Sequence, residues 1–279
     1  MIKFFRNIRQ SLIMENKTGK SAAMPSAGKP AVRYLKYAIG EIVLVVIGIL
    51  IALQINNWNE SRKERQQEKA ILYQLNIDFQ SNLKQLDQKI VLKKEAVNSA
   101  LQLFKYIDFE ELRNKDSVDY HLARTIPFTT FDPIVNDLAI NEALRIIKND
   151  SLKNKLTYWT TEIADHKEDE LNWKDYRDNR YVPFLINHYQ LRTVRNLANK
   201  TNFLGKYLIE DSNNTTTNAI GKSKYVEDYN LLLDHPDYED HLERCFTINK
   251  FSLNQSLIIR KKIIDILNIL NILNSEINQ

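Results

Sequence analysis

YAIGEIVLVVIGILIALQI, at residues 37–55, is an almost unbroken apolar run. A helix over residues 37–58 would be about 30 Å long, close to the thickness of the hydrocarbon core of a bilayer. The ten Ile, Leu and Val residues between positions 42 and 53 together contribute about −5 kcal/mol to membrane insertion. We therefore expect a transmembrane helix over residues 34–57, with Tyr37 and Trp58 as interfacial aromatic residues at its two edges.

Two other structures fit an apolar run of this kind. The frequent β-branched residues are compatible with a buried strand or helix of a soluble core, but the insertion energy favours the membrane. A cleaved signal peptide normally has a shorter apolar region followed by a small-residue cleavage site, and the exit of this run, IALQINN, has none. The run is therefore predicted to be an uncleaved anchor.

Basic residues are distributed unevenly around the run. Residues 1–36 contain eight Lys or Arg residues and one acidic residue, Glu15, whereas basic and acidic residues alternate over residues 60–69. Because Lys and Arg favour the cytoplasmic side, we expect residues 1–33 to be a cytoplasmic tail and linker, and residues 58–279 to be extracytoplasmic. Residues 2–14 fit either a basic amphipathic helix on the leaflet or a disordered tail. The net charge of +4 thus comes from the tail and does not indicate a nucleic-acid partner.

Three residues of the apolar run, one ionisable and two small, differ from its large aliphatic side chains. Glu41 is an ionisable group in a membrane segment, so it is either functional or, being about one turn inside Tyr37, extends its carboxylate to the interface. Gly48 and Ala52 form a small-xxx-small pair, which allows close approach of a second helix and hence a homodimer.

The remainder of the chain has helical periodicity. No Gly or Pro occurs between Gly48 and Pro127, and apolar residues recur at steps of three, four and seven from Leu72 to Phe104. This pattern predicts one continuous, coiled-coil-like helix from Trp58 to about residue 107. A loop is expected over residues 114–137, followed by helices at 137–176, 184–208, 225–233, 238–245 and 249–277. The predicted fold class is all-α, with one transmembrane helix that continues into a long helix and an extracytoplasmic helical bundle.

Two clusters of His and acidic residues are candidate metal sites. The first is EIADHKEDE at residues 162–170, in which Glu162 and His166 share a helix face, although no Glu-x-x-His motif occurs anywhere in the chain. The second is DHPDYEDH at residues 234–241, with His235, Asp237 and His241, and its spacing matches no metalloprotease motif. A solvated acidic helix face at 162–170 and a polar turn at 234–241 are the simpler explanations of the two clusters.

Motifs for nucleophilic or phosphate chemistry are absent from the sequence. There is no G-x-S-x-G motif and no Gly-rich loop, and the single Cys245 fits a buried position on an amphipathic helix. No catalytic residue and no cofactor is therefore predicted.

The N-terminal sequence resembles a known family. MIKFFRNIRQ at residues 1–10, together with residues 37–60, is similar to the uncharacterised single-pass bacterial membrane proteins of domain-of-unknown-function family 6090. LRIIKNDSLKNKL at residues 144–156 is similar to a second, looser pattern of that family. The resemblance implies a bacterial inner-membrane location and a helical domain, and it carries no activity.

These observations predict a membrane-anchored helical protein without enzymatic activity. It would serve as an interaction, scaffold or ligand-sensing module of the cell envelope, with the lipid bilayer and an envelope protein as its partners. The alternative is a metal-dependent enzyme or metal-binding protein that uses the cluster at 162–170 or at 234–241.

Overall fold

The computed structural model describes residues 29–134, 137–200, 220–225 and 228–277. Regular structure in these residues is helical, and they contain no β-strand, which confirms the predicted all-α fold class. The proposed amphipathic helix at residues 2–14 lies outside the described residues. By its internal contacts the chain divides into two compact units, residues 1–62 and residues 63–279.

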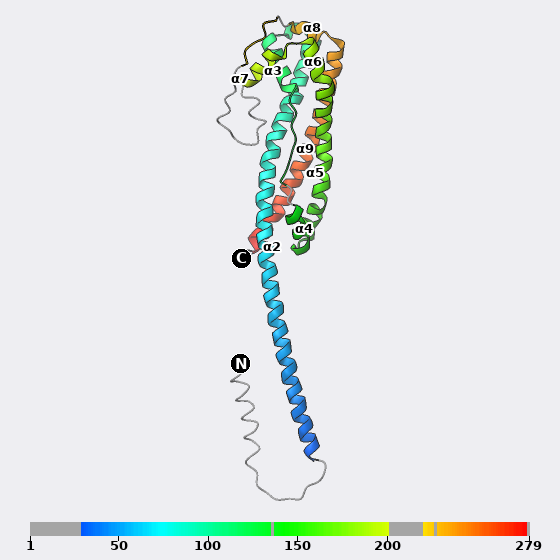
Figure 1. The fold of residues 1–279 in the computed structure, drawn as a ribbon. Helices are drawn as coiled ribbons and strands as arrows, with labels where there is room; N and C mark the ends of the chain where they lie inside the picture. The colour runs from blue at the N-terminus through cyan, green and yellow to red at the C-terminus, as the bar shows by residue number, and fades with distance from the viewer. Residues whose placement is uncertain (1–28, 135–136, 201–219, 226–227, 278–279) are drawn as a thin grey trace. The chain divides into compact units, whose positions relative to one another are not determined.

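The longest element is α2, Lys29–Asp108, shown in blue to cyan in Figure 1. It confirms the prediction that the apolar helix continues past Trp58, and the absence of Gly and Pro explains why nothing interrupts it. The helix starts earlier than expected, because residues 29–33 were assigned to the linker. In the first unit, every described residue from Ala38 to Trp58 is exposed.

The second unit contains the other helices of the described residues. In chain order these are η1 (Glu110–Leu112), α3 (Lys115–Thr125), α4 (Asp137–Ile146), α5 (Asp150–Tyr176), the π-helical turn η2 (Arg177–Tyr181), α6 (Val182–His188), α7 (Leu191–Lys200), α8 (Tyr229–Leu233) and α9 (Pro236–Ile277). Polar side chains cap several of their N-termini. Asn114 accepts from the Ser117 N–H at the start of α3, and Asn149 accepts from the Leu152 N–H at the start of α5.

Several expectations about element boundaries were wrong. The helix predicted at 137–176 is interrupted at residues 147–149, between α4 and α5, and the helix predicted at 225–233 begins only at Tyr229. The predicted loop at 114–137 contains α3, because the Asn114 side chain caps the N-terminus of a helix there. The two helices predicted at 238–245 and 249–277 are one helix, α9, because Phe246, Thr247 and Ile248 between them are helical and include no Gly or Pro. The helix predicted at 184–208 is divided: α6 ends at His188 and α7 begins at Leu191, while residues 201–208 lie outside the described part.

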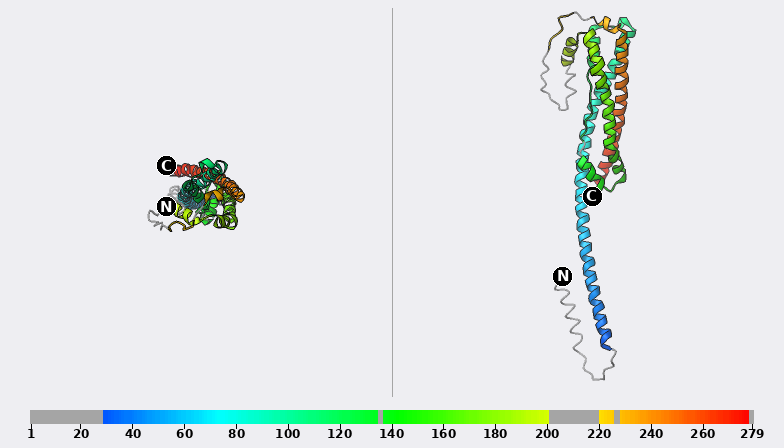
Figure 2. Two further views of the ribbon diagram at one scale, coloured as in Figure 1. Left: turned by 90° about the horizontal axis from the view of Figure 1, so that it is seen from above. Right: turned by 45° about the vertical axis from the view of Figure 1, so that its right-hand side comes forward.

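Within the second unit, α5, α9 and the second half of α2 lie side by side (Figures 1 and 2). Helix α9 runs antiparallel to α2, as shown by contacts between Asn76 and Asn271, Asp87 and Arg260, and Phe104 and Phe246. An irregular segment at residues 126–134, here called the strap, connects α3 toward α4 and runs along these helices (Figure 1).

Two hydrophobic clusters form the core of this unit. The first joins α2 residues 72–97 to α4, the first half of α5 and the second half of α9, with Trp159 and Phe79 in ring contact at 5.0 Å. The second joins α2 residues 92–106 to α3, the end of α5, α6, α7, α8 and the start of α9. On α5 the first cluster ends at Ile163 and the second begins at Trp173, and buried polar residues occupy the interval.

Candidate functional site: a buried polar layer

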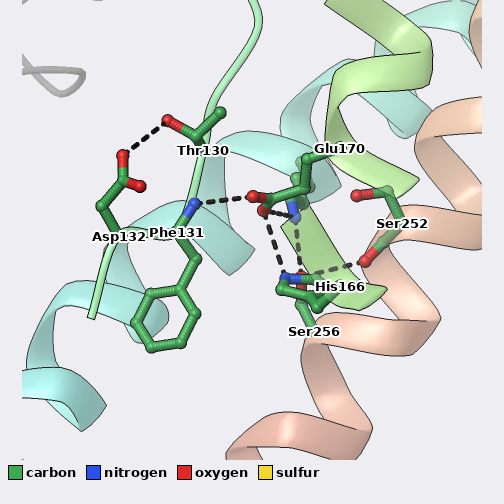
Figure 3. Close-up of polar contacts among 8 residues, drawn as sticks. Thr130, Phe131, Asp132, His166, Glu170, Ser252 and Ser256 are labelled. Atoms are coloured by element: carbon green, nitrogen blue, oxygen red, sulfur yellow. Dashed lines mark hydrogen bonds and ion pairs between the residues drawn. The ribbon is translucent and has the colours of Figure 1, made fainter. Parts of the chain in front are cut away.

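The polar layer lies where the two hydrophobic clusters meet. Its central members come from three helices: Lys93 from α2, His166 and Glu170 from α5, and Ser256 from α9. All four are buried, and the side chains of Lys93 and Glu170 are only 4% and 0% exposed. Figure 3 shows most of this layer together with the strap residues that reach it.

Lys93 and Glu170 form the ion pair at the centre of the layer. The ammonium of Lys93 donates to Oε1 of Glu170 and, at 2.7 Å, to the hydroxyl oxygen of Ser256. Lys93 therefore has two acceptors in a site that excludes water. Such a pair is costly to separate, because either charge left alone would be buried without compensation.

The hydrogen bonds fix the proton positions on Ser256 and His166. The Ser256 hydroxyl donates to the Ser252 carbonyl oxygen at 2.9 Å, so its oxygen acts as an acceptor toward its other neighbours. Nε2 of His166 lies 3.3 Å from that hydroxyl and 3.2 Å from Oε1 of Glu170, and both contacts require an Nε2–H donor. A serine nucleophile would need the opposite arrangement, in which the imidazole nitrogen accepts the hydroxyl proton. The Ser256–His166 contact is thus not a nucleophile–base pair.

The second carboxylate oxygen of Glu170 holds the strap. Oε2 accepts the backbone N–H of Phe131 at 2.7 Å, and the Phe131 ring is fully buried in the first cluster (Figure 3). The side-chain amide of Asn82 binds the strap at Ile134, accepting its N–H at 2.7 Å and donating to its carbonyl oxygen at 3.1 Å. The side chains of Glu170 and Asn82 thus supply hydrogen-bond partners for backbone groups of the strap, which forms no β-sheet that could pair them.

The electrostatics of the pair follow from burial and mutual attraction. Burial alone would raise the pKa of Glu170, but the hydrogen bond from His166 and the charge of Lys93 outweigh it, so the pKa lies below the ordinary value. Burial lowers the pKa of Lys93, and Glu170 offsets this only in part. Burial also lowers the pKa of Lys89, one turn before Lys93 on α2. The layer therefore holds charged groups inside the bundle.

The cluster predicted at 162–170 is divided between two environments. His166 points into the polar layer, whereas Glu162 forms an ion pair with Lys262 of α9 near the surface. These two candidate metal ligands therefore have separate partners. The cluster also includes Glu170, which was not among the predicted metal ligands.

The cluster predicted at 234–241 forms the start of α9. Nδ1 of His235 accepts the backbone N–H of Asp237 at 3.1 Å, so the ring caps the helix and its proton must be on Nε2. In this arrangement the Nδ1 lone pair of His235 is already used within the chain. Asp237 is exposed in the first turn, where a negative charge is favourable. His241 instead contacts the Tyr176 hydroxyl at 2.9 Å through its Nδ1.

Within the described residues, no group of three or more His, Cys, Asp or Glu side chains is placed to hold a metal ion. Cys245 is buried, and burial raises the pKa of its thiol far above the ordinary value. Its sulfur lies 3.8 Å from the Thr125 carbonyl oxygen in the second cluster.

The predicted membrane-anchor residues all lie in α2. One helix among the described residues is long and apolar enough to cross a membrane, and none of its apolar window is buried. Tyr37 lies in this helix, and Glu41, Gly48, Ala52 and Trp58 are exposed in it. A Cβ atom placed on Gly48 would meet no atom within 4 Å, so the chain's own packing does not require glycine there.

Lys93 and Ser256 are central to the layer and were missed from sequence. A signal for Lys93 was present, because Leu86, Ile90, Lys93 and Val97 follow the spacing of one buried helix face. A lysine on that face predicts a buried partner. The partner itself, 77 residues further along the chain, has no local signal.

Taken together, the layer can hold charge, fix the register of three helices and retain the strap. It offers no exposed reactive group, because each of its central side chains is buried and bonded inside the bundle.

No curated protein and no solved structure matches the chain. The family model described as "Family of unknown function (DUF6090)" matches residues 41–124. The matched segment covers most of the apolar run, the remainder of α2 and nearly all of α3, including Lys93. The similar segments at residues 1–10 and 144–156 lie outside it. The chain is therefore similar to this family of unknown function over residues 41–124.

Proposed function

We propose that this protein is a single-pass anchor of the bacterial inner membrane. In this proposal residues 1–33 lie in the cytoplasm, and the helical bundle acts outside it as an interaction module of the cell envelope. The observation that carries the proposal is the wholly exposed apolar window of α2. Soluble proteins rarely expose contiguous apolar patches above a few hundred Å², whereas a bilayer stabilises such a surface.

A role in interaction, as a scaffold or ligand sensor, is supported by how the bundle uses its chemistry. The charged residues of the polar layer contact one another and the strap, so they stabilise an arrangement of helices and are not available to a substrate. The exposed charged, polar and apolar side chains lie instead on the outer faces of the helices, where a partner can contact them.

Membrane attachment is tested by fractionation of the full chain in a bacterial host. We expect the wild-type protein to remain in the membrane pellet after alkaline carbonate extraction. Leu50→Arg places a charge in the middle of the apolar window and should move a large fraction to the supernatant. Ile258→Arg is the matched control, because Ile258 is a similarly exposed apolar residue on α9. Release of the wild-type protein by carbonate would refute the anchor.

Orientation is tested separately by reporter fusions. A reporter active only in the cytoplasm should be active when fused near residue 10 and inactive when fused after residue 279. Activity of the C-terminal fusion would refute the proposed orientation and leave the anchor itself intact.

A further inference from the structure

A stripe of exposed residues runs along one side of α2 in the bundle. Lys94, Asn98, Leu101 and Lys105 are spaced by four, three and four residues, so their side chains share one face of the helix. All four are exposed, and Leu101 is 44% exposed although it is a large apolar residue. The face therefore combines two cations with an uncovered leucine.

Helix α9 carries a stripe of the same composition. Lys250, Asn254, Leu257 and Lys261 have the same residue types in the same order and at the same spacing. All four are again exposed, with Leu257 40% exposed.

The two stripes flank one seam between the helices. Asp87, one heptad before Lys94 on the α2 stripe, contacts Arg260 of α9 at 2.6 Å. With the Phe104–Phe246 contact, this pair sets an antiparallel register that brings Lys94 level with about residue 254. We call the eight residues of the two stripes the basic seam.

The basic seam has a surplus of positive charge. Within the part of the chain that the structure describes, none of its four lysines forms an ion pair or a side-chain hydrogen bond. The nearby carboxylate of Asp87 is already paired with Arg260. Two seams placed face to face would oppose lysine to lysine, and the N-terminal tail is itself basic. The surface thus fits an acidic helix with apolar side chains.

Such a helix face exists on α5. Tyr158, Thr161, Asp165, Glu168 and Asn172 follow helical spacing and are all exposed, with Tyr158 64% exposed. Within the described residues, the carboxylates of Asp165 and Glu168 have no ion-pair partner, unlike that of Glu162. This acidic stripe spans about 21 Å, and each stripe of the basic seam spans about 16 Å, so their lengths are compatible.

We propose that the acidic stripe of α5 in one copy docks into the basic seam of a second copy. The contact is heterologous, because two different surfaces of the same chain meet. Its charges are exposed, so it is weak in dilute solution and weakens with salt, and confinement to a membrane raises the effective concentration of the partner. It extends the proposed interaction role, but its test in micelles does not depend on the membrane orientation.

The experiment measures association of the full chain in neutral detergent micelles, by energy transfer between separately labelled copies. The seam-reversed variant carries Lys94→Glu and Lys261→Glu, and the stripe-reversed variant carries Asp165→Lys and Glu168→Lys. Each variant alone should associate about tenfold more weakly than wild type, as expected for the loss of two exposed ion pairs. A one-to-one mixture should regain association, because every reversed surface then meets an opposite charge.

Two controls separate this contact from others. Lys222→Glu reverses an exposed lysine outside the basic seam and should have no effect. Gly48→Leu alters the small-residue pair in the apolar run and should also leave association unchanged. Circular dichroism confirms that each variant is folded. The proposal is overturned if wild type does not associate at low salt, if Gly48→Leu abolishes association, or if the mixture fails to regain it.

Discussion

Replacement of Glu170 by Gln should destabilise the bundle far more than a typical polar substitution. Glutamine preserves the volume and can still accept the Phe131 N–H, but it removes the charge that compensates Lys93. Breaking one side of a buried pair typically costs about 3–5 kcal/mol. The cost has a ceiling, because Lys93 can release its proton. Neutralising a lysine with an ordinary pKa of 10.5 at pH 7 costs about 5 kcal/mol.

This loss is large compared with the total stability of a domain, which is about 5–15 kcal/mol. Urea unfolding of the full chain in micelles, followed by circular dichroism, provides the measurement. With a slope of about 2 kcal/mol per molar urea, the midpoint should fall by about 1.5–2.5 M. Glu168→Gln is the matched control, because Glu168 is exposed on the same helix, and its effect should stay within about 0.5 kcal/mol.

Two further measurements test whether Lys93 and Glu170 form a compensated charge pair. Lys93→Met combined with Glu170→Gln removes both charges, so the double variant should be more stable than Glu170→Gln alone. In Glu170→Gln, the pKa of Lys93 is depressed further in the folded state, so the unfolded state binds more protons and stability should rise with pH. A midpoint shift equal to that of Glu168→Gln, or a double variant less stable than the single one, would refute the account of the layer as a compensated charge pair.

Other predictions concern pH, the strap and the start of α9. Burial lowers the pKa of His121 and of His241 in the folded state. As the pH falls below 6.5, the unfolded state therefore binds protons before the folded state does. The bundle should lose stability over this pH range. Urea midpoints at pH 7.5 and pH 5 measure this, and His→Gln at both positions should reduce the difference. Asn82→Ala removes both side-chain bonds to Ile134, so amide exchange in the strap should accelerate while exchange in α9 does not; equal acceleration in both would contradict it. His235→Ala removes a helix cap and should cost about 1 kcal/mol, without changing the zinc content measured after dialysis.

The long helix and the buried pair show how far sequence alone could reach. The course of α2 follows from local facts, namely apolar length, helical spacing and the absence of helix breakers, so its continuation past Trp58 was predictable. Cap chemistry is also local, so the capping side chains Asn114 and His235 mark the starts of α3 and α9 in the sequence. The errors at these places came from treating polar residues as loop signals.

The polar layer depended on contacts that no local pattern specifies. Helical spacing places Lys93 and His166 on buried faces, but which side chain each one meets depends on the register between helices. Lys93 contacts Glu170 and Ser256, which are 77 and 163 residues away along the chain. The two His clusters had several possible roles in sequence, and packing assigned them to a buried layer, a surface ion pair and a helix cap.

By itself, the sequence determined the all-α class, one helix able to cross a membrane, and a basic N-terminal region, because composition and periodicity suffice for each. Only the tertiary structure decided which charges are buried in pairs and which remain uncovered on α2, α5 and α9. The physical reason is that burial and pairing are properties of neighbours in space. Those neighbours are set by the packing register of helices that are distant in the chain.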